Sequence, residues 1–238
     1  MRKLLNVVVS ICLTLFVIGS SVIITMNIKS IYYNDIDKLN IESMINLSRE
    51  DIIENYDYLI DYNLSWNAEE FELPSLPSSQ NGKIHFEEVR DIFQNVKILT
   101  IICGVISVVG GILQIRKKDF KFLRNASILI VIMPVLLAIP ITINFNACFI
   151  MFHKIMFSNN YWIFNPVLDP VINMLPEAFF MHMGIAILGI MVCASVILQL
   201  IYHKVKKLNH GNIKIKNKIT KIIILKECRI IGMMDILK

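Results

Sequence analysis

Four long apolar segments constrain the fold of this chain more than any other feature of its sequence. They cover residues 4–26, 98–115, 128–149 and 184–202, and the second is long enough only if its helix begins upstream. A helix needs about 20 apolar residues to cross the roughly 30 Å hydrocarbon core of a bilayer. With 55% apolar residues among 238, we predict an all-α integral membrane protein with four transmembrane helices.

The charged residues predict how these helices are oriented. Basic residues occur before the first span, in "RKKDFKFLR" between the second and third, and in "HKVKKLNHGNIKIKNKITK" after the fourth. Residues 29–96 hold 14 of the 19 acidic residues, and the connection at 150–180 has Lys154 as its one cation. The positive-inside rule therefore predicts that both termini are cytoplasmic and that 29–96 and 150–180 lie outside. The net charge of +5 suits anionic lipid and does not indicate nucleic-acid binding.

The chain divides into a four-helix transmembrane domain at 1–207 and a basic cytoplasmic tail at 208–238. Within the domain we expect an outer cap at 29–96 and an outer connection at 150–180. The cap contains "LSREDIIENYDYLIDYN", in which apolar residues recur at helical spacing and Ser48 with Asp51 forms a plausible capping box. This pattern predicts an amphipathic helix that lies on the membrane surface or roofs the spans. The cap is too poor in apolar residues for a large core of its own.

Further boundaries follow from prolines and glycines. The second span is predicted to begin near His85, and the fourth at Pro176, which suits a first helical turn. Pro134 and Pro140 are expected to kink the third span. Glycines of the second span favour close helix packing over catalysis; these are Gly104, Gly110 and Gly111.

Two histidines are the strongest candidates for chemistry. His85 and His153 lie at the outer ends of the second and third spans, so they are expected at similar membrane depth. Imidazole titrates near neutral pH, so such a pair suits general acid–base chemistry on a lipid ester. Two interfacial histidines with structural hydrogen bonds are the alternative. A metal site built from His85, His153, His182 and Asp169 is a further alternative, although no close ligand pair such as HExxH is present.

Two segments resemble the signature segments of the lipoprotein intramolecular transacylase family, four-span plasma-membrane enzymes of Gram-positive bacteria. In "HFEEVRDI" the matching residues are His85, Val89 and Arg90, with Phe86 and Glu88 in place of Met and Asp. The second is "FHKIMFSNNYWIFNPVLDPVINMLPEAFF". Its matching residues are Phe152, His153, Phe157, Asn159, Trp162, Pro166, Asp169, Pro176, Glu177, Phe179 and Phe180. The family pattern has Asp where this chain has Asn160 and Asn165, which removes two negative charges near His153.

The resemblance implies an enzyme that moves the sn-2 acyl chain of a diacylglyceryl-cysteine lipoprotein to the α-amino group of the same cysteine. It implies His85 and His153 as the acid–base pair, with either ring as the base. Residues expected to contact or position the substrate are Arg90, Asn159, Trp162 and Asp169. The acyl chains would lie between the second, third and fourth spans, where Pro134 and Pro140 open a gap.

The implied partners are a diacylated bacterial lipoprotein and membrane lipids, with no nucleic acid, no cofactor and no metal. The implied location is the bacterial plasma membrane, with the active site on its extracellular face. A non-enzymatic outer-face protein that binds lipids or lipoproteins is the alternative from another class, and a membrane metallohydrolase is a third. The oligomeric state is not predicted.

Overall fold

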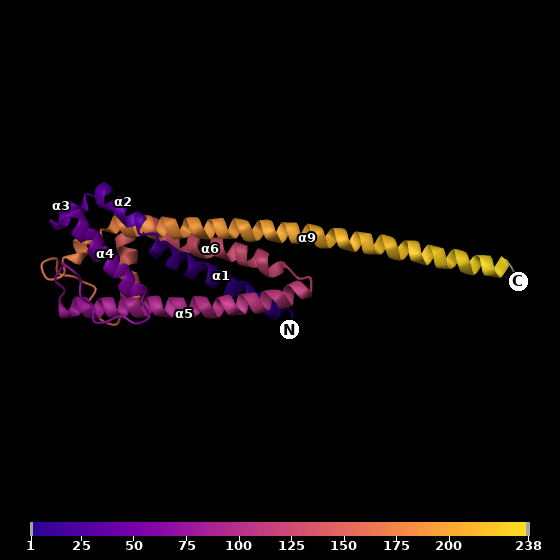
Figure 1. Ribbon diagram of the computed structural model, residues 1–238, viewed down its shortest axis with the longest axis horizontal. Coiled ribbons are helices and arrows are strands. Elements are labelled where there is room, and N and C mark those ends of the chain that lie inside the picture. The colour runs from indigo at the N-terminus through magenta and orange to yellow at the C-terminus, as the bar shows by residue number, and fades with distance from the viewer. Residues whose placement is uncertain (1, 237–238) are drawn as a thin grey trace.

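The computed structural model describes residues 2–236, a range that contains nine helices and no strand. The long helices α1, α5, α6 and α9 run side by side, and the shorter helices α2, α3 and α4 gather at one end of this bundle (Figure 1). In chain order the helices are α1 (Arg2–Asn27), α2 (Ser30–Lys38), α3 (Ile41–Ile45), α4 (Arg49–Leu64), α5 (Gln80–Arg116), α6 (Lys121–Ile143), α7 (Phe145–Met156), α8 (Val171–Met174) and α9 (Glu177–Ile236).

The four long helices are the predicted membrane spans. Helices α1, α5, α6 and the first part of α9 are each long and apolar enough to cross a bilayer. Their outward side chains are widely exposed, and Val108, Leu136 and Leu200 are each more than 60% exposed. Apolar surface of this extent needs a lipid environment to cover it. The all-α, four-span fold is therefore confirmed.

Helix α1 is the centre of the bundle, because it packs against α5, α6 and α9. One face of α1 buries small polar side chains separated by four or seven positions: Asn6, Ser10, Thr14, Ser21 and Thr25. A Cβ on Gly19 would collide with Thr100 of α5, and a Cβ on Gly110 would collide with Val9 of α1. The two backbones therefore approach closely through glycine, as the sequence predicted for Gly110.

The cap, defined here as α2, α3, α4 and the loop 65–79, covers one end of the bundle. Helix α4 begins as predicted, because the Ser48 hydroxyl accepts a hydrogen bond from the Asp51 backbone N–H at 3.1 Å. Its apolar face is buried and packs onto α5, so α4 roofs the spans. The cap does not form its apolar core alone, since Val171 and Met174 of α8 and Phe179 of α9 complete it.

The third span ends earlier than predicted. Helix α6 stops at Ile143, six residues before the expected end at 149. Asn144 adopts an extended backbone conformation, and its side-chain oxygen accepts a hydrogen bond from Ala147 N at 2.9 Å. This cap starts α7, a separate helix, because an Asn side chain competes with the helix backbone for hydrogen bonds. His153 therefore lies on α7 and not on the third span.

Helices α5 and α9 are both longer than their predicted spans. Helix α5 begins at Gln80, five residues before His85, because the Ser79 side chain caps it by accepting from Gly82 N at 3.0 Å. Helix α9 follows Pro176 as predicted and continues to Ile236, beyond the bundle (Figure 1). The predicted boundary at 207–208 thus falls inside a helix, and residues 237–238 of the predicted tail lie outside the described residues.

Candidate active site

A cavity of about 410 Å³ lies where the cap meets the spans. Its walls come from α1, α4, α5, α7 and α9 and from the connection between α7 and α9. Most lining side chains are apolar, and polar side-chain atoms come from Tyr56, Asn63, His85, His153 and Trp162. A mostly apolar cavity with a few polar groups is typical of a small-ligand site, and lipid-like chains fit its character.

The position of this cavity corrects one prediction. We expected acyl chains between the second, third and fourth spans, beside Pro134 and Pro140. Instead, α1 contributes Val22 and Met26, and the described lining contains no residue of α6. The break at Asn144 explains the difference, because α7 replaces the outer part of the third span as a wall of the cavity.

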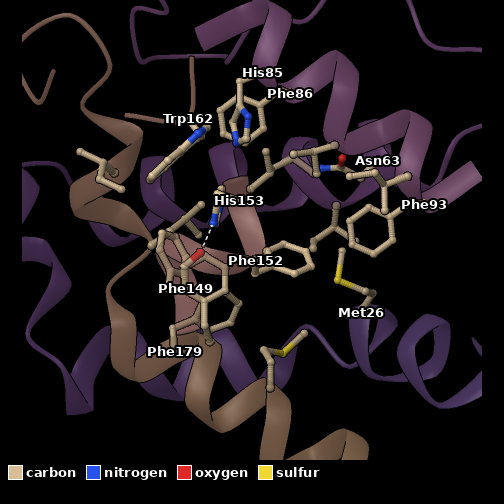
Figure 2. A pocket seen from close by; sticks show the side chains of 18 of the residues that line it. Met26, Asn63, His85, Phe86, Phe93, Phe149, Phe152, His153, Trp162 and Phe179 are labelled. Carbon is tan, nitrogen blue, oxygen red and sulfur yellow. Dashed lines mark hydrogen bonds between the residues drawn. The ribbon is translucent and has the colours of Figure 1, made fainter. Parts of the chain in front are cut away.

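The structure brings His85 and His153 together, as the sequence predicted. Both are buried, with 5% and 9% of their surface exposed, and their ring centroids are 6.0 Å apart. Phe157 packs on His85 at 4.8 Å and Phe149 on His153 at 4.0 Å, measured between ring centroids. One small substrate group can contact both rings at this spacing. Figure 2 shows the two histidines on neighbouring walls of the cavity.

The hydrogen bond at His153 identifies its protonated nitrogen. His153 Nδ1 lies 2.7 Å from the Phe149 carbonyl oxygen, which can only accept (Figure 2). In the neutral ring Nδ1 therefore carries the hydrogen, and Nε2 keeps a free lone pair. Helix α7 lies outside the four spans. Burial lowers the pKa of His153, and the Phe149 bond opposes that shift. His153 is thus neutral at neutral pH, with Nε2 as the basic atom.

The other histidine has no comparable restraint. His85 Nδ1 is buried and has no hydrogen-bond partner among residues 2–236. Two positive rings so close together would repel each other, so at most one of the pair is protonated at a time.

Trp162 lies against His153, with 4.9 Å between the ring centroids. Its Nε1 donates to the Asn159 carbonyl oxygen at 3.2 Å. The Asn159 side chain does not line the described cavity, because Nδ2 donates to Glu88 Oε1 at 2.7 Å and Oδ1 accepts from Tyr161 N. Trp162 therefore lines the cavity, while Asn159 lies outside it and accepts the indole hydrogen bond.

Arg90 and Asp169, two other predicted substrate contacts, do not line the described cavity either. Arg90 donates to the Trp66 carbonyl oxygen at 2.9 Å and its guanidinium lies over Tyr62. Asp169 accepts from the Ser79 backbone N–H at 2.7 Å and from the Ser79 hydroxyl at 2.8 Å. Both residues fasten outer segments to α5 in this arrangement.

The metal alternative is not supported by the positions of its four proposed ligands. His182 bonds through Nδ1 to Asp35 Oδ2 at 2.8 Å, and Asp169 is held by Ser79. Within the part of the chain that the structure describes, no three His, Cys, Asp or Glu side chains are grouped to hold a metal ion.

The Asn in place of Asp at 165 has a local explanation. Asn165 Oδ1 accepts from Val167 N at 2.9 Å, and the Asn165 carbonyl oxygen accepts from Asp169 N at 2.8 Å. An Asn side chain makes this turn as well as an Asp side chain does.

Sequence reasoning missed two features of the site. Glu88 accepts a hydrogen bond from the side chain of Asn159, which lies 71 residues further along the chain. The pair of half-buried His182 with buried Asp35 joins α9 to the cap. The one sequence signal for Glu88 was its place in the signature segment, where the family has Asp. No sequence spacing indicates that residues 35 and 182 lie together.

Comparisons with known proteins identify the family of this chain. The family profile for the lipoprotein intramolecular transacylase Lit matches residues 7–180. A solved structure of the membrane-integral transacylase Lit from Bacillus cereus is 38% identical, with a TM-score of 0.85, and the match covers 89% of this chain and 98% of that one. Two more structures of that protein carry Arg or Ala in place of a histidine at its position 85, with TM-scores of 0.83 and 0.82. A comparison with curated protein sequences found no match. The chain therefore belongs to the lipoprotein intramolecular transacylase family, and it is a membrane-integral acyltransferase.

Proposed function

We propose that this enzyme moves the sn-2 acyl chain of a diacylglyceryl-cysteine lipoprotein to the α-amino group of the same cysteine. The product carries one acyl chain on nitrogen and one on glycerol. The observation that carries this proposal is the pair of buried histidines that face one apolar cavity, 6.0 Å apart between ring centroids. Membership in the transacylase family supports the same reaction.

His153 is the base in this proposal. The α-amino group has a pKa of about 7.7–8.0, so its proton can pass to the free Nε2 of His153 at little cost. The nitrogen lone pair then attacks the carbonyl carbon of the sn-2 ester and forms a tetrahedral oxyanion. The amine and the ester belong to one molecule, so their proximity supplies much of the acceleration.

His85 is the acid in this proposal. As the bond between the acyl carbon and the sn-2 oxygen breaks, neutral His85 gives its ring N–H hydrogen to that oxygen, and its other ring nitrogen accepts the proton that His153 took from the amine. An amide and a free hydroxyl remain, both rings are neutral again, and the two are never protonated together. No covalent acyl-enzyme is needed, and no cofactor enters the balance.

The apolar walls explain why the acyl chain would go to nitrogen and not to water. Phe149 and Phe157 pack directly on the two imidazoles. Rings in these positions keep water away from the tetrahedral centre, which suppresses hydrolysis of the ester.

We further propose that the cap and the cavity face the outside of a bacterial plasma membrane. Basic residues near the α5–α6 turn and acidic residues in the cap support this orientation. In a protein whose five native cysteines are replaced by serine, a single cysteine at exposed Ser43 of the cap or at exposed Lys121 tests it. An impermeant maleimide added to intact cells should label the S43C variant and not the K121C variant; the reverse pattern would contradict the orientation.

The reaction is tested by mass spectrometry of a lipoprotein's N-terminal peptide. Cells that make diacylated lipoprotein should convert it to the lyso form when they express this enzyme, and the mass of the peptide with its lipid stays constant while fragments place one chain on nitrogen. Conversion should disappear in H85A and H153A. The relative solved with Ala at its own position 85 keeps a similar fold, which supports the use of such variants. Unchanged diacyl product, or conversion that survives both substitutions, would contradict the proposal.

A further inference from the structure

The active site lacks a carboxylate partner for its histidines. Among the described residues, the one histidine that pairs with a carboxylate is His182, which bonds to Asp35 away from the catalytic rings. If His153 takes a proton from the substrate, the imidazolium must be stabilised by other groups. The Phe149 carbonyl oxygen at Nδ1 is one such group, and the face of Trp162 is the other.

An aromatic face can do this work because its ring quadrupole attracts a cation. The centroids of His153 and Trp162 are 4.9 Å apart and the ring planes are inclined by 36°. This lies within the roughly 6 Å over which cation–π attraction is effective, and tryptophan is the strongest partner. The attraction grows only as His153 becomes charged, so it favours the reaction step over the resting state.

Trp162 lies in an irregular connection, so its position depends on its contacts. Its Nε1 donates to the Asn159 carbonyl oxygen, and Asn159 is held in turn by Glu88 through a 2.7 Å hydrogen bond. Glu88 lies three residues after His85 on the same rigid helix. Helix α5 thus carries one catalytic histidine and also the anchor for the ring that packs on the other.

We propose that Glu88 is a positioning residue for the acyl transfer. Through Asn159 it fixes Trp162 against His153, and the indole face stabilises the imidazolium that forms when His153 takes the amine proton. This inference rests on the proposed reaction. It also moves Asn159 from a predicted substrate contact to the support of Trp162.

The surroundings of the half-buried Glu88 side chain agree with this role. Its Oε2 is shielded from solvent and lacks a hydrogen-bond partner in the described chain, while Oε1 accepts from Asn159. A shielded carboxylate oxygen without a partner costs stability, and a positioning role for the other oxygen gives a reason for it. Its neighbour Glu87 is exposed and provides a matched control on the same helix.

Three single variants separate positioning from charge. E88L removes the anchor and should lower kcat about 10-fold with KM changed less than 2-fold, because small misplacements of catalytic groups reduce the rate steeply. E88Q keeps an oxygen that can accept from Asn159 and should stay within about 3-fold of the parent enzyme. E87L should behave as the parent. An E88Q enzyme as slow as E88L, or an equal loss in E87L, would overturn the inference.

A swap of donor and acceptor tests the link to Asn159. N159D places two carboxylates together and should reduce kcat about as much as E88L. In the double variant E88Q/N159D, the new amide can donate to the new carboxylate, so kcat should recover. W162L combined with E88L should be no slower than W162L alone, since both act on one contact. Failure of the swap to restore kcat, or additive losses, would contradict the proposal.

A spectroscopic measurement tests the same contact without the reaction. The chain has two tryptophans, so W66F leaves Trp162 as the only tryptophan, and its emission can be separated from that of the tyrosines by the excitation wavelength. A protonated imidazole quenches a neighbouring indole, so Trp162 emission should fall as His153 is protonated at acid pH, and E88L should weaken this titration. If the lipoprotein is not converted but the titration behaves as stated, the proposed function fails and the anchoring by Glu88 stands. A titration unchanged by E88L would overturn the anchoring itself.

Discussion

The cap and the spans are packed with different side chains. In the cap, large aromatic side chains such as Tyr32, Tyr56 and Phe71 are fully buried. In the spans, α1 instead buries polar side chains, most of which carry a hydroxyl group. Tyr32 and Tyr56 stack with 3.8 Å between their centroids. The spans instead approach through Gly19 and Gly110 and turn their large apolar side chains outward. Water drives the first arrangement by the hydrophobic effect, and close backbone packing in lipid drives the second.

This difference teaches where precise chemistry can be built. Lipid-facing helices have one packed side, but the junction with the cap forms a cavity whose walls come from several helices. His85 reaches this cavity from the span α5 and His153 reaches it from α7, while α4 contributes a further wall.

The largest effect is expected at the junction. H153A should lower kcat/KM by about 10²- to 10⁴-fold, the usual contribution of a general base, and leave thermal unfolding in detergent nearly unchanged. H203A removes an exposed histidine of α9 and serves as the control. Steady-state rates on a synthetic diacyl lipopeptide measure both variants. If H153A has a normal kcat/KM, the active site does not lie at the junction.

In the cap, a large-to-small change should cost the most stability. Phe71 is fully buried and packs on Phe86 with 4.4 Å between ring centroids. F71A should reduce the free energy of unfolding by about 3–5 kcal/mol, because it leaves a cavity in a packed core. Denaturant unfolding of the detergent-solubilised protein checks this value. A small change in the free energy of unfolding would mean that the cap core is loosely packed and adjusts to the loss of the ring.

In the spans, the opposite change should be harmful. A Cβ on Gly110 would collide with Val9, which is fully buried and has a stiff branched side chain. G110A should therefore cost about 1–3 kcal/mol through overpacking, although alanine is the better helix former. Gly189 has open space around its Cβ position, so G189A is the control and should not destabilise. Equal stability of both variants would contradict close packing of α1 on α5.

The pH dependence should reflect the buried position of His153. Burial lowers its pKa, so the protonated, inactive form accumulates only below its ordinary value of about 6.5. In the enzyme–substrate complex, kcat should hold as pH falls toward 6.5 and then drop about tenfold per unit below the lowered pKa. The substrate amine titrates separately, near 7.7–8.0. A substrate analogue whose amine has a lower pKa separates the two titrations. If kcat still falls with a group whose pKa is above 6.5, the result would contradict His153 as the base.

The smallest effect is expected on the lipid-facing surface. Val108 of α5 is 63% exposed within the protein. V108A should change the free energy of unfolding by less than about 0.5 kcal/mol, since it removes no internal contact of note. The same unfolding measurement checks it. A cost similar to that of G110A would show that Val108 packs on another protein surface.

The helices were predictable from sequence because hydropathy and capping are local properties. The four spans and the Ser48 cap of α4 required no knowledge of tertiary contacts. The cap core was not predictable, because Tyr32, Phe71 and Met174 come from three separate segments and meet only in the fold. The end of α6 was also missed, since apolar residues continue past Asn144 and only the cap hydrogen bond marks the break.

The candidate site was predictable to the same limited degree. The proximity of His85 and His153 was predictable because both lie near the ends of apolar segments on the same side of the bundle. Side-chain direction was not available from the sequence, so Arg90 and Asp169 were expected at the substrate while the structure places them against Trp66 and Ser79. The hydrogen bond of Glu88 could not be foreseen either, because its partner Asn159 lies 71 residues further along the chain.

The polar face of α1 has a consequence for how the protein is made. Helix α1 is synthesised before α5, α6 and α9, so it enters the bilayer while the surfaces that will cover it do not yet exist. Ser10, Thr14 and Ser21 each donate their hydroxyl hydrogen to the carbonyl four residues earlier in the same helix, at 2.6 to 2.9 Å. These groups are thus satisfied inside the helix itself and are tolerated in hydrocarbon. During biogenesis α1 can therefore remain in the membrane as an independent helix until α5, α6 and α9 are inserted and pack against it.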